Sequence, residues 1–250
     1  MALPKRVYGF RKSGHLKLTG PNINVGFSAP LDLPPVIDLR DKMPTVYDQG
    51  ALGSCTANAL AGGVEFIRQD NITPSRLFLY YNEREIDGTV NQDSGSTIAT
   101  GIHSLNTQGI CPESLWGYNV TDFNVKPTPP CYAEALKELL TGYSELTTIT
   151  DIHKSLASGF PVAFGMQIFS YMESSAMAET GVLHMPDLYN ERYEGGHALL
   201  IVGIDIPSNV VIIRNSWGAN WGKNGYFTAP IEYIANPQLA SDFWSIHKIS

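Results

Sequence analysis

Residues 48–55 read Asp-Gln-Gly-Ala-Leu-Gly-Ser-Cys, and a stretch with helical periodicity follows them directly. Within residues 54–71, apolar side chains recur at spacings of four and three at Leu60, Val64 and Ile67. This spacing predicts a helix with one apolar face. The octapeptide therefore leads into the start of a helix that packs against the core.

Cys55 is expected to open this helix, with Ser54 as its N-cap. The start of a helix carries a partial positive charge and unpaired N–H groups, and both favour a thiolate. Taken alone, the pattern is more typical of a small buried cysteine. Gly62 and Gly63 lower the helix propensity, so we expect close packing on their face.

Two blocks far downstream change that interpretation. Residues 195–198 read Gly-Gly-His-Ala, and residues 214–218 read Arg-Asn-Ser-Trp-Gly. Nucleophilic catalysis by a cysteine needs an imidazole, a group that orients the imidazole, and donors for an oxyanion. Cys55 and these two blocks together offer a candidate for each of these groups.

These blocks, in this order, resemble papain and the cathepsins, the family of papain-like cysteine peptidases. Residues 36–40 (Val-Ile-Asp-Leu-Arg) resemble the start of the mature enzymes, and residues 215–226 resemble their glycine-rich closing block. The resemblance runs from about residue 34 to 249. It implies a cysteine-type peptidase that hydrolyses peptide bonds through an acyl-thioester intermediate, with a Cys–His thiolate–imidazolium pair.

The resemblance also implies a role for each site residue. Cys55 would be the nucleophile, His197 the acid–base partner and Asn215 the acceptor that fixes the ring. The side-chain amide of Gln49 would complete the oxyanion hole beside the Cys55 N–H. Trp217 would shield the His–Asn hydrogen bond from water.

Four residues are expected to bind substrate: Gly95, Ser96, Gly196 and Trp217. Gly95 resembles the glycine region along the edge of the family's cleft. An ordinary turn glycine is an equally good interpretation of Gly95.

The pattern of elements predicts an α+β, papain-like fold with two lobes and the active-site cleft between them. A helix-rich lobe is expected over about residues 50–142 and a β-rich, barrel-like lobe over about 143–240, within one peptidase domain, 34–250. Further helices are expected at 74–86, 96–107 and 133–140, with a loop at 127–131, and strands at 160–168, 197–205, 210–215 and 225–229.

The chain departs from the family in two linked places. The family usually has a cysteine where this chain has Leu52, and a Cys-x-Gly-Gly sequence where residues 93–96 read Asp-Ser-Gly-Ser. Both ends of one disulfide are thus missing together, which favours a reducing location. The family also has an aromatic residue at the position of Thr56, so the packing beside the nucleophile is expected to differ.

Residues 1–33 differ in composition from the rest and are shorter than the family's propeptide. One hypothesis is that this extension covers the cleft and limits access until it is displaced or cut. A flexible tail is an equally good interpretation.

The composition of the chain limits the kinds of binding partner that we expect. The formal net charge of −7 gives no basic footprint for nucleic acid, and no segment reaches the roughly 20 apolar residues that span a bilayer. We expect a peptide or protein substrate, no nucleic-acid or membrane partner, no cofactor or metal, and a monomer. No signal peptide is evident, so a cytoplasmic location is mildly favoured.

Some alternatives remain open in the sequence. Cys111 and Cys131 could form a disulfide or remain two free thiols. The same Cys–His pair would serve an amidase or transpeptidase, and a noncatalytic peptide-binding protein is the alternative from another class. Asp242 would favour basic substrate side chains if it faced the specificity pocket.

Overall fold

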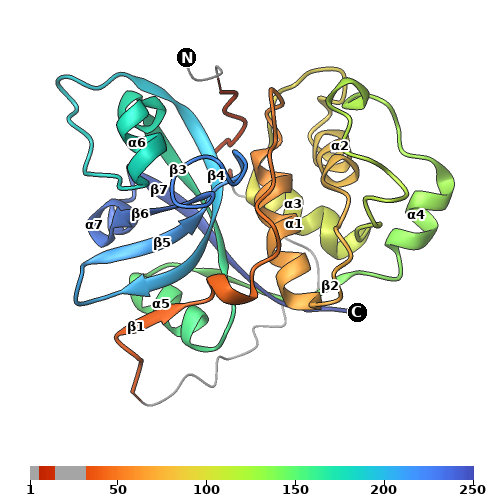
Figure 1. The fold of residues 1–250 in the computed structure, drawn as a ribbon. Coiled ribbons are helices and arrows are strands. Elements are labelled where there is room, and N and C mark those ends of the chain that lie inside the picture. Colours follow the sequence, from red (N-terminus) through yellow and green to blue (C-terminus); the bar gives the residue numbers. More distant parts are fainter. Residues whose placement is uncertain (1–5, 15–31) are drawn as a thin grey trace.

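A computed structural model of the protein describes residues 6–14 and 32–250. Helices and strands are mixed, with α1 to α4 gathered on one side and most strands on the other (Figure 1). The helices are α1 (Cys55–Arg68), α2 (Arg76–Ile86), α3 (Ile98–Thr107), α4 (Pro129–Ala135), α5 (Ile149–Ala157), α6 (Ser175–Thr180) and α7 (Ile231–Ala235), with short 3₁₀ turns η1 (Arg40–Lys42), η2 (Val120–Asp122) and η3 (Ser170–Glu173).

The strands form one antiparallel sheet in the order β2-β7-β3-β4-β5-β6, and β1 pairs with β4. Among the described residues, β2 and β6 do not pair with each other, so the sheet is open. The strands are β1 (Val36–Asp38), β2 (Leu140–Leu146), β3 (Val162–Phe169), β4 (Tyr193–Asp205), β5 (Val210–Arg214), β6 (Tyr226–Pro230) and β7 (Ala240–Ile249).

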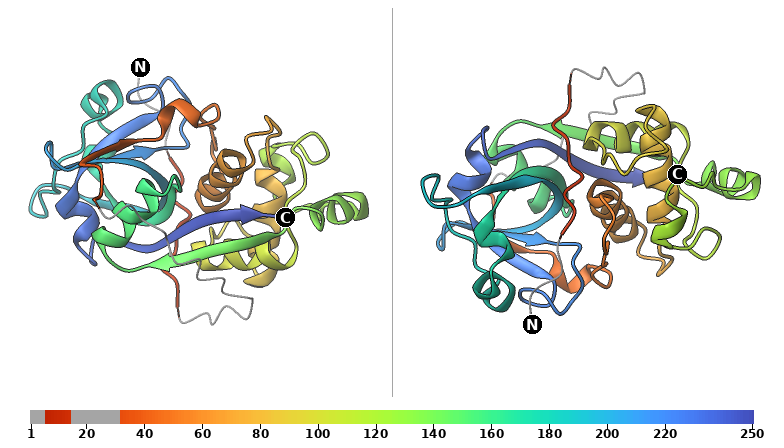
Figure 2. Two further views of the ribbon diagram at one scale, coloured as in Figure 1. Left: turned by 90° about the horizontal axis from the view of Figure 1, so that it is seen from below. Right: turned by 90° about the horizontal axis from the view of Figure 1, so that it is seen from above.

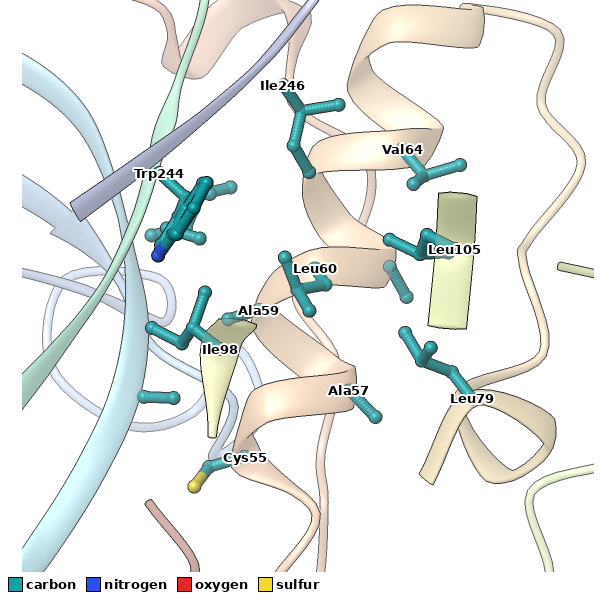
Figure 3. Packing of buried hydrophobic residues seen from close by; sticks show 14 of the residues in the cluster. Cys55, Ala57, Ala59, Leu60, Val64, Leu79, Ile98, Leu105, Trp244 and Ile246 are labelled. Atoms are coloured by element: carbon teal, nitrogen blue, oxygen red, sulfur yellow. The ribbon is translucent and has the colours of Figure 1, made fainter. Parts of the chain in front are cut away.

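Helix α1 packs in the centre of the molecule, against strands β4 and β7 and helices α2 and α3. Leu60 and Val64 are fully buried on its apolar face, and Figure 3 shows them among side chains from β7 and the other helices. A β-carbon at Gly63 would lie 3.1 Å from Cδ1 of Ile246, and one at Gly62 would lie 3.3 Å from Nε of Arg214. The expected close packing of the two glycines is confirmed.

Two predicted helix starts differ from the structure. Ser54 occupies the N-cap position of α1 as predicted, but its side chain makes no capping bond and its hydroxyl hydrogen-bonds the Tyr118 hydroxyl. Helix α2 starts after Ser75, whose side chain accepts from the Phe78 N–H, so Pro74 lies outside the helix. Helix α4 begins at Pro129, within the expected loop, because proline fits the first positions of a helix, where no N–H is needed.

Strands β2 and β7 were not expected from the sequence. Strand β2 pairs with residues 243–249 of β7, and the two strands reach toward the helical side, where they pack on α3 and α1 (Figure 2). The structure thus joins its helical and β-rich parts through α1 and through this strand pair.

We expect Gly109→Ala to destabilise the protein more than Gly159→Ala. Both glycines follow a helix with positive φ, 72° and 85°, which costs alanine roughly 1–2 kcal/mol. A β-carbon at Gly109 would also lie 1.9 Å from the Ala135 carbonyl oxygen, whereas nothing lies within 4 Å of one at Gly159. Urea unfolding should show a loss larger by about 1–3 kcal/mol for Gly109→Ala. Equal losses would contradict the close contact.

Candidate active site

Cys55 is the first residue of α1 and is fully buried. Figure 3 shows it at the end of the helix, at the margin of the apolar cluster. Burial raises the pKa of its thiol to about 11, while backbone N–H groups of Ala198, Gly9 and Thr56 oppose the rise. In this conformation the protonated thiol is therefore the favoured form.

His197 lies on β4, and its Nε2 is 2.9 Å from Oδ1 of Asn215. The backbone N–H of Ser216 donates to the same Oδ1 at 2.8 Å, so that atom is an acceptor. His197 Nε2 must then carry the donated proton, which leaves Nδ1 as the basic nitrogen. Trp217 stacks on the imidazole, with ring centroids 5.1 Å apart, and is itself buried.

The two reacting side chains are not hydrogen-bonded to each other in this structure. Nδ1 of His197 is buried without a hydrogen-bond partner among the described residues. Burial lowers the pKa of His197 to about 4, although the hydrogen bond that the ring donates to Asn215 acts in the opposite direction. The expected thiolate–imidazolium pair is therefore not the favoured form here, because both groups are shut away from water.

Gln49 is fully buried beside Cys55 in the chain's octapeptide loop. Its Oε1 accepts from the Ser216 hydroxyl at 2.6 Å, which fixes the orientation of the amide. Its Nε2 then donates to the carbonyl oxygens of Leu52 at 2.9 Å and Val7 at 3.3 Å. The amide that the sequence assigns to an oxyanion hole thus contacts a carbonyl of the N-terminal segment.

The N-terminal segment, residues 6–14, runs between the helical part and the sheet (Figure 2, right). Ser96 donates its N–H to the Gly9 carbonyl at 2.8 Å and accepts from the Arg11 N–H at 2.9 Å. On the other side, the Phe10 N–H donates to the Gly196 carbonyl at 3.0 Å. The segment therefore bridges α3's leading loop and β4 directly over the candidate site.

All four residues expected to bind substrate contact this segment. Ser96 and Gly196 make the backbone bonds, and a β-carbon at Gly95 would lie 1.8 Å from the Gly9 carbonyl oxygen. Trp217 packs edge-on against Tyr8 and lies under the guanidinium of Arg6 at 4.9 Å.

Phe10 makes the deepest contact of the segment. Only 6% of its surface is exposed, and its ring occupies the space that a side chain at Gly165 would need. Tyr8 lies edge-on to the His197 ring and donates to Glu173 at 2.6 Å. No motif in the sequence marks Phe10 or Tyr8, because their partners lie far along the chain.

The departure at Thr56 is matched by a second polar residue. Thr56 Oγ1 donates to Oε2 of Glu83 at 2.6 Å, and both residues are fully buried. Burial, with a further contribution from nearby Asp87, raises the pKa of Glu83 to about 8. Sequence reasoning missed Glu83, which lies on the otherwise unremarkable helix α2.

The missing disulfide is also replaced by a polar contact. The Gly53 N–H donates to both carboxylate oxygens of Asp93 at 3.0 Å, and the Tyr80 hydroxyl donates to the same carboxylate. Asp93 thus holds the loop before Cys55 against the loop that leads to Ser96.

The remaining open questions concern cysteines and charges. Cys111 and Cys131 are both free thiols, buried together beside Phe78. Asp242 is partly buried and accepts from the Ser13 N–H at 2.9 Å, so it faces the N-terminal segment.

Within the described ranges, no helix is both long and apolar enough to cross a membrane. The same residues hold no group of three or more ligand-type side chains suited to a metal ion.

Comparison with known proteins gives one consistent result. A sequence profile described as papain family cysteine protease matches residues 33–241. An uncharacterized peptidase C1-like protein of Acanthamoeba polyphaga mimivirus is 39% identical over 98% of this chain and 81% of its own length. Cathepsin J of Mus musculus is 27% identical over 84% of this chain and 64% of its own length.

Solved structures agree. Xylellain, a cysteine protease from Xylella fastidiosa, superposes with a TM-score of 0.85 at 37% identity, over 100% of both chains. Procathepsin L 3 of Tenebrio molitor, at 19% identity, shares the fold with a TM-score of 0.69 over 92% of this chain and 75% of that one. A buried thiol, an oriented imidazole and this fold together define a cysteine-type hydrolase. The chain belongs to the papain family of cysteine proteases, as the profile and the mimiviral relative show.

We expect Glu83→Gln to become more stable relative to the wild type as the pH rises from 5 to 8. The folded pKa near 8 lies above the ordinary 4.5, so in this range the folded state holds a proton that the unfolded state has lost. Wild-type stability therefore falls as pH rises toward 8, and glutamine has no such titration. Urea unfolding at pH 5, 6.5 and 8 measures the difference.

The exposed Glu179→Gln controls for the loss of one carboxylate at the surface. Parallel stability curves for Glu83→Gln and the wild type across this range would contradict the raised pKa.

Proposed function

We propose that this papain-family cysteine peptidase cleaves peptide bonds with Cys55 as nucleophile, His197 as acid and base, and Asn215 as the orienting group. The observation that carries the assignment is the bond from His197 Nε2 to Asn215, because it leaves Nδ1 free to take a proton. The family membership makes the chain a hydrolase; the roles of the individual residues are our inference.

The proposed reaction begins when Nδ1 of His197 takes the proton of the Cys55 thiol. The sulfur attacks the carbonyl carbon, and the electron pair of the C=O bond moves to oxygen. His197 then gives its proton to the leaving nitrogen, the C–N bond breaks, and an acyl-thioester remains on Cys55. A water molecule, deprotonated by His197, attacks this thioester and releases the acid and the thiol.

Gln49 is proposed to stabilise the oxyanion together with the backbone N–H of Cys55. Support comes from the Val7 carbonyl, which accepts from Gln49 Nε2 at 3.3 Å. A carbonyl oxygen is thus already found where the amide would meet a substrate oxygen. The Ser216 hydroxyl holds the amide in this orientation at 2.6 Å, so little reorganisation is needed.

We also propose the finer description of the fold as two lobes around the substrate cleft, with a helical lobe over about 50–142 and a β-rich lobe over about 143–240. The separate grouping of α1 to α4 and of the strands supports it (Figure 1). The N-terminal segment contacts Ser96 on one side and Gly196 on the other, as a peptide in such a cleft would.

The N-terminal extension is proposed to restrain activity by occupying the cleft. Residues 6–14 bury Cys55 and His197, and that burial shifts both pKa values away from the reactive charged pair. These contacts support the cleft-covering hypothesis over a flexible tail. The rest of the extension, residues 1–5 and 15–31, lies outside the described residues.

We expect Cys55→Ala to abolish hydrolysis of a fluorogenic peptide and Gln49→Ala to lower kcat about 10²–10³-fold with a smaller change in KM. One oxyanion donor typically has that effect on kcat. Cys111→Ala is the matched control, since this thiol lies in a separate cluster with Phe78. Full activity of Cys55→Ala would overturn the proposed function, and an unchanged kcat in Gln49→Ala would overturn only the oxyanion assignment.

We expect Phe10→Ala to raise kcat/KM roughly tenfold or more, because it removes the deepest anchor of the N-terminal segment. The alkylation rate of Cys55 by iodoacetamide, located by mass spectrometry, should rise with it. Lys12→Ala, an exposed change in the same segment, should leave both rates near those of the wild type. Unchanged rates in Phe10→Ala would show that the segment does not limit access.

A further inference from the structure

A carboxylate lines the cleft where no assigned function uses it. Asp87 follows the last turn of α2 and is 16% exposed. Its Oδ2 accepts from the Ser96 hydroxyl at 2.9 Å, and its Oδ1 accepts from the Thr100 hydroxyl at 3.2 Å. Two hydroxyl donors therefore hold the carboxylate in one orientation.

A cation already occupies the remaining side of this carboxylate. The guanidinium of Arg11 forms an ion pair with Asp87 and lies 3.5 Å from the Gly95 carbonyl oxygen. Asp87 is thus a formed cation-binding position, filled here by the protein's own N-terminal segment. The Arg11 side chain is 45% exposed, so it lies at the open margin of the cleft.

The order of residues along the segment places this position relative to the nucleophile. The Gly9 backbone contacts Cys55, the Phe10 ring fills the space over Gly165, and Arg11 comes next. In the opposite direction, Tyr8 lies against His197. His197 must protonate the leaving amine, so Tyr8 marks the leaving-group side and Phe10 and Arg11 mark the acyl side.

We infer that Asp87 is a specificity-determining residue, which selects a cationic side chain at the third residue before the scissile bond. The inference rests on the proposed peptidase function and names the substrate class of that same site. A substrate that pairs with Ser96 carries this side chain where Arg11 now lies. The second residue takes the apolar space of Phe10.

Arginine suits this position better than lysine does. One nitrogen of Arg11, Nη2, donates to the Asp87 carboxylate and also lies 3.5 Å from the Gly95 carbonyl oxygen. The planar guanidinium keeps further donors for a second contact with the carboxylate. An ammonium group donates from a single point. We therefore expect the order arginine, lysine, neutral, with an acidic residue least favoured because it would meet Asp87.

The test uses the full-length protein and peptides of the form acetyl-Xaa-Phe-Gly-aminomethylcoumarin, where Xaa is arginine, lysine, citrulline or glutamate. Citrulline keeps the shape of arginine without its charge. The measured quantity is the ratio of kcat/KM for arginine to that for citrulline. Only protein molecules whose N-terminal segment has left the cleft can cleave either peptide, so both kcat/KM values are multiplied by the same fraction of open molecules. Their ratio therefore does not depend on how often the segment leaves.

The wild type should prefer arginine over citrulline by about tenfold, the lower end for a hydrogen bond to a charged group, because the Arg11 side chain in this position is 45% exposed. In Asp87→Asn the ratio should fall to near one, while the citrulline peptide is still cleaved, which shows that the variant is folded. Arg11→Gln is the matched control. It weakens the segment from the other side of the same ion pair, so it should raise both rates and keep the ratio.

Three results would overturn the inference. The first is an equal kcat/KM for the arginine and citrulline peptides in the wild type, and the second is an arginine preference that Asp87→Asn retains. The third is the same arginine preference in a peptide where arginine and phenylalanine have exchanged places. The last two would show that the acidic protein attracts cationic peptides in general. Failure of the proposed function looks different, because then none of the peptides is cleaved by any variant.

Discussion

The packing of α1 against β4 is the contact on which the site depends. Cys55 is the first residue of the helix and His197 lies on the strand, so their relative position is set wherever these two elements meet. Gly62 and Gly63 allow that meeting, because side chains there would press on Arg214 and Ile246. A β-carbon at Gly62 or Gly63 would also lie 3.9 or 3.8 Å from Leu200 of β4, so a larger residue at either position would crowd the contact between helix and strand.

The N-terminal segment acts on the charge state of the same two side chains. The helix start and the oriented imidazole favour a charged pair, whereas burial beneath residues 6–14 favours neutral groups, and burial prevails in this conformation. Under the proposed restraint of activity, the same contacts would both cover the site and favour the neutral forms of Cys55 and His197.

The features that can be predicted from the sequence are those whose residues lie next to one another along the chain. Cys55, His197 and Asn215 each lie in a short motif with a recognisable chemical purpose, and helix α1 follows from its apolar spacing. The pairs Thr56–Glu83 and Arg11–Asp87 carry no such signal, because each joins two segments that only the fold brings together. Strand β7 was not predicted for a similar reason. It is buried because it pairs with β2 on one side and β3 on the other, and both strands lie far from it in the sequence.

Asp93 shows how one physical requirement can be met by different chemistry. The loop before Cys55 must stay close to the loop of Ser96, because together they form one wall of the cleft. The family's usual disulfide does this with a covalent bond, and here one carboxylate does it through the Gly53 N–H and the Tyr80 hydroxyl. A charge-assisted hydrogen bond needs no oxidant, so this wall forms equally well in a reducing compartment. At both departures from the family pattern, Asp93 and Thr56, a hydrogen bond to a carboxylate now holds the residues next to the nucleophile.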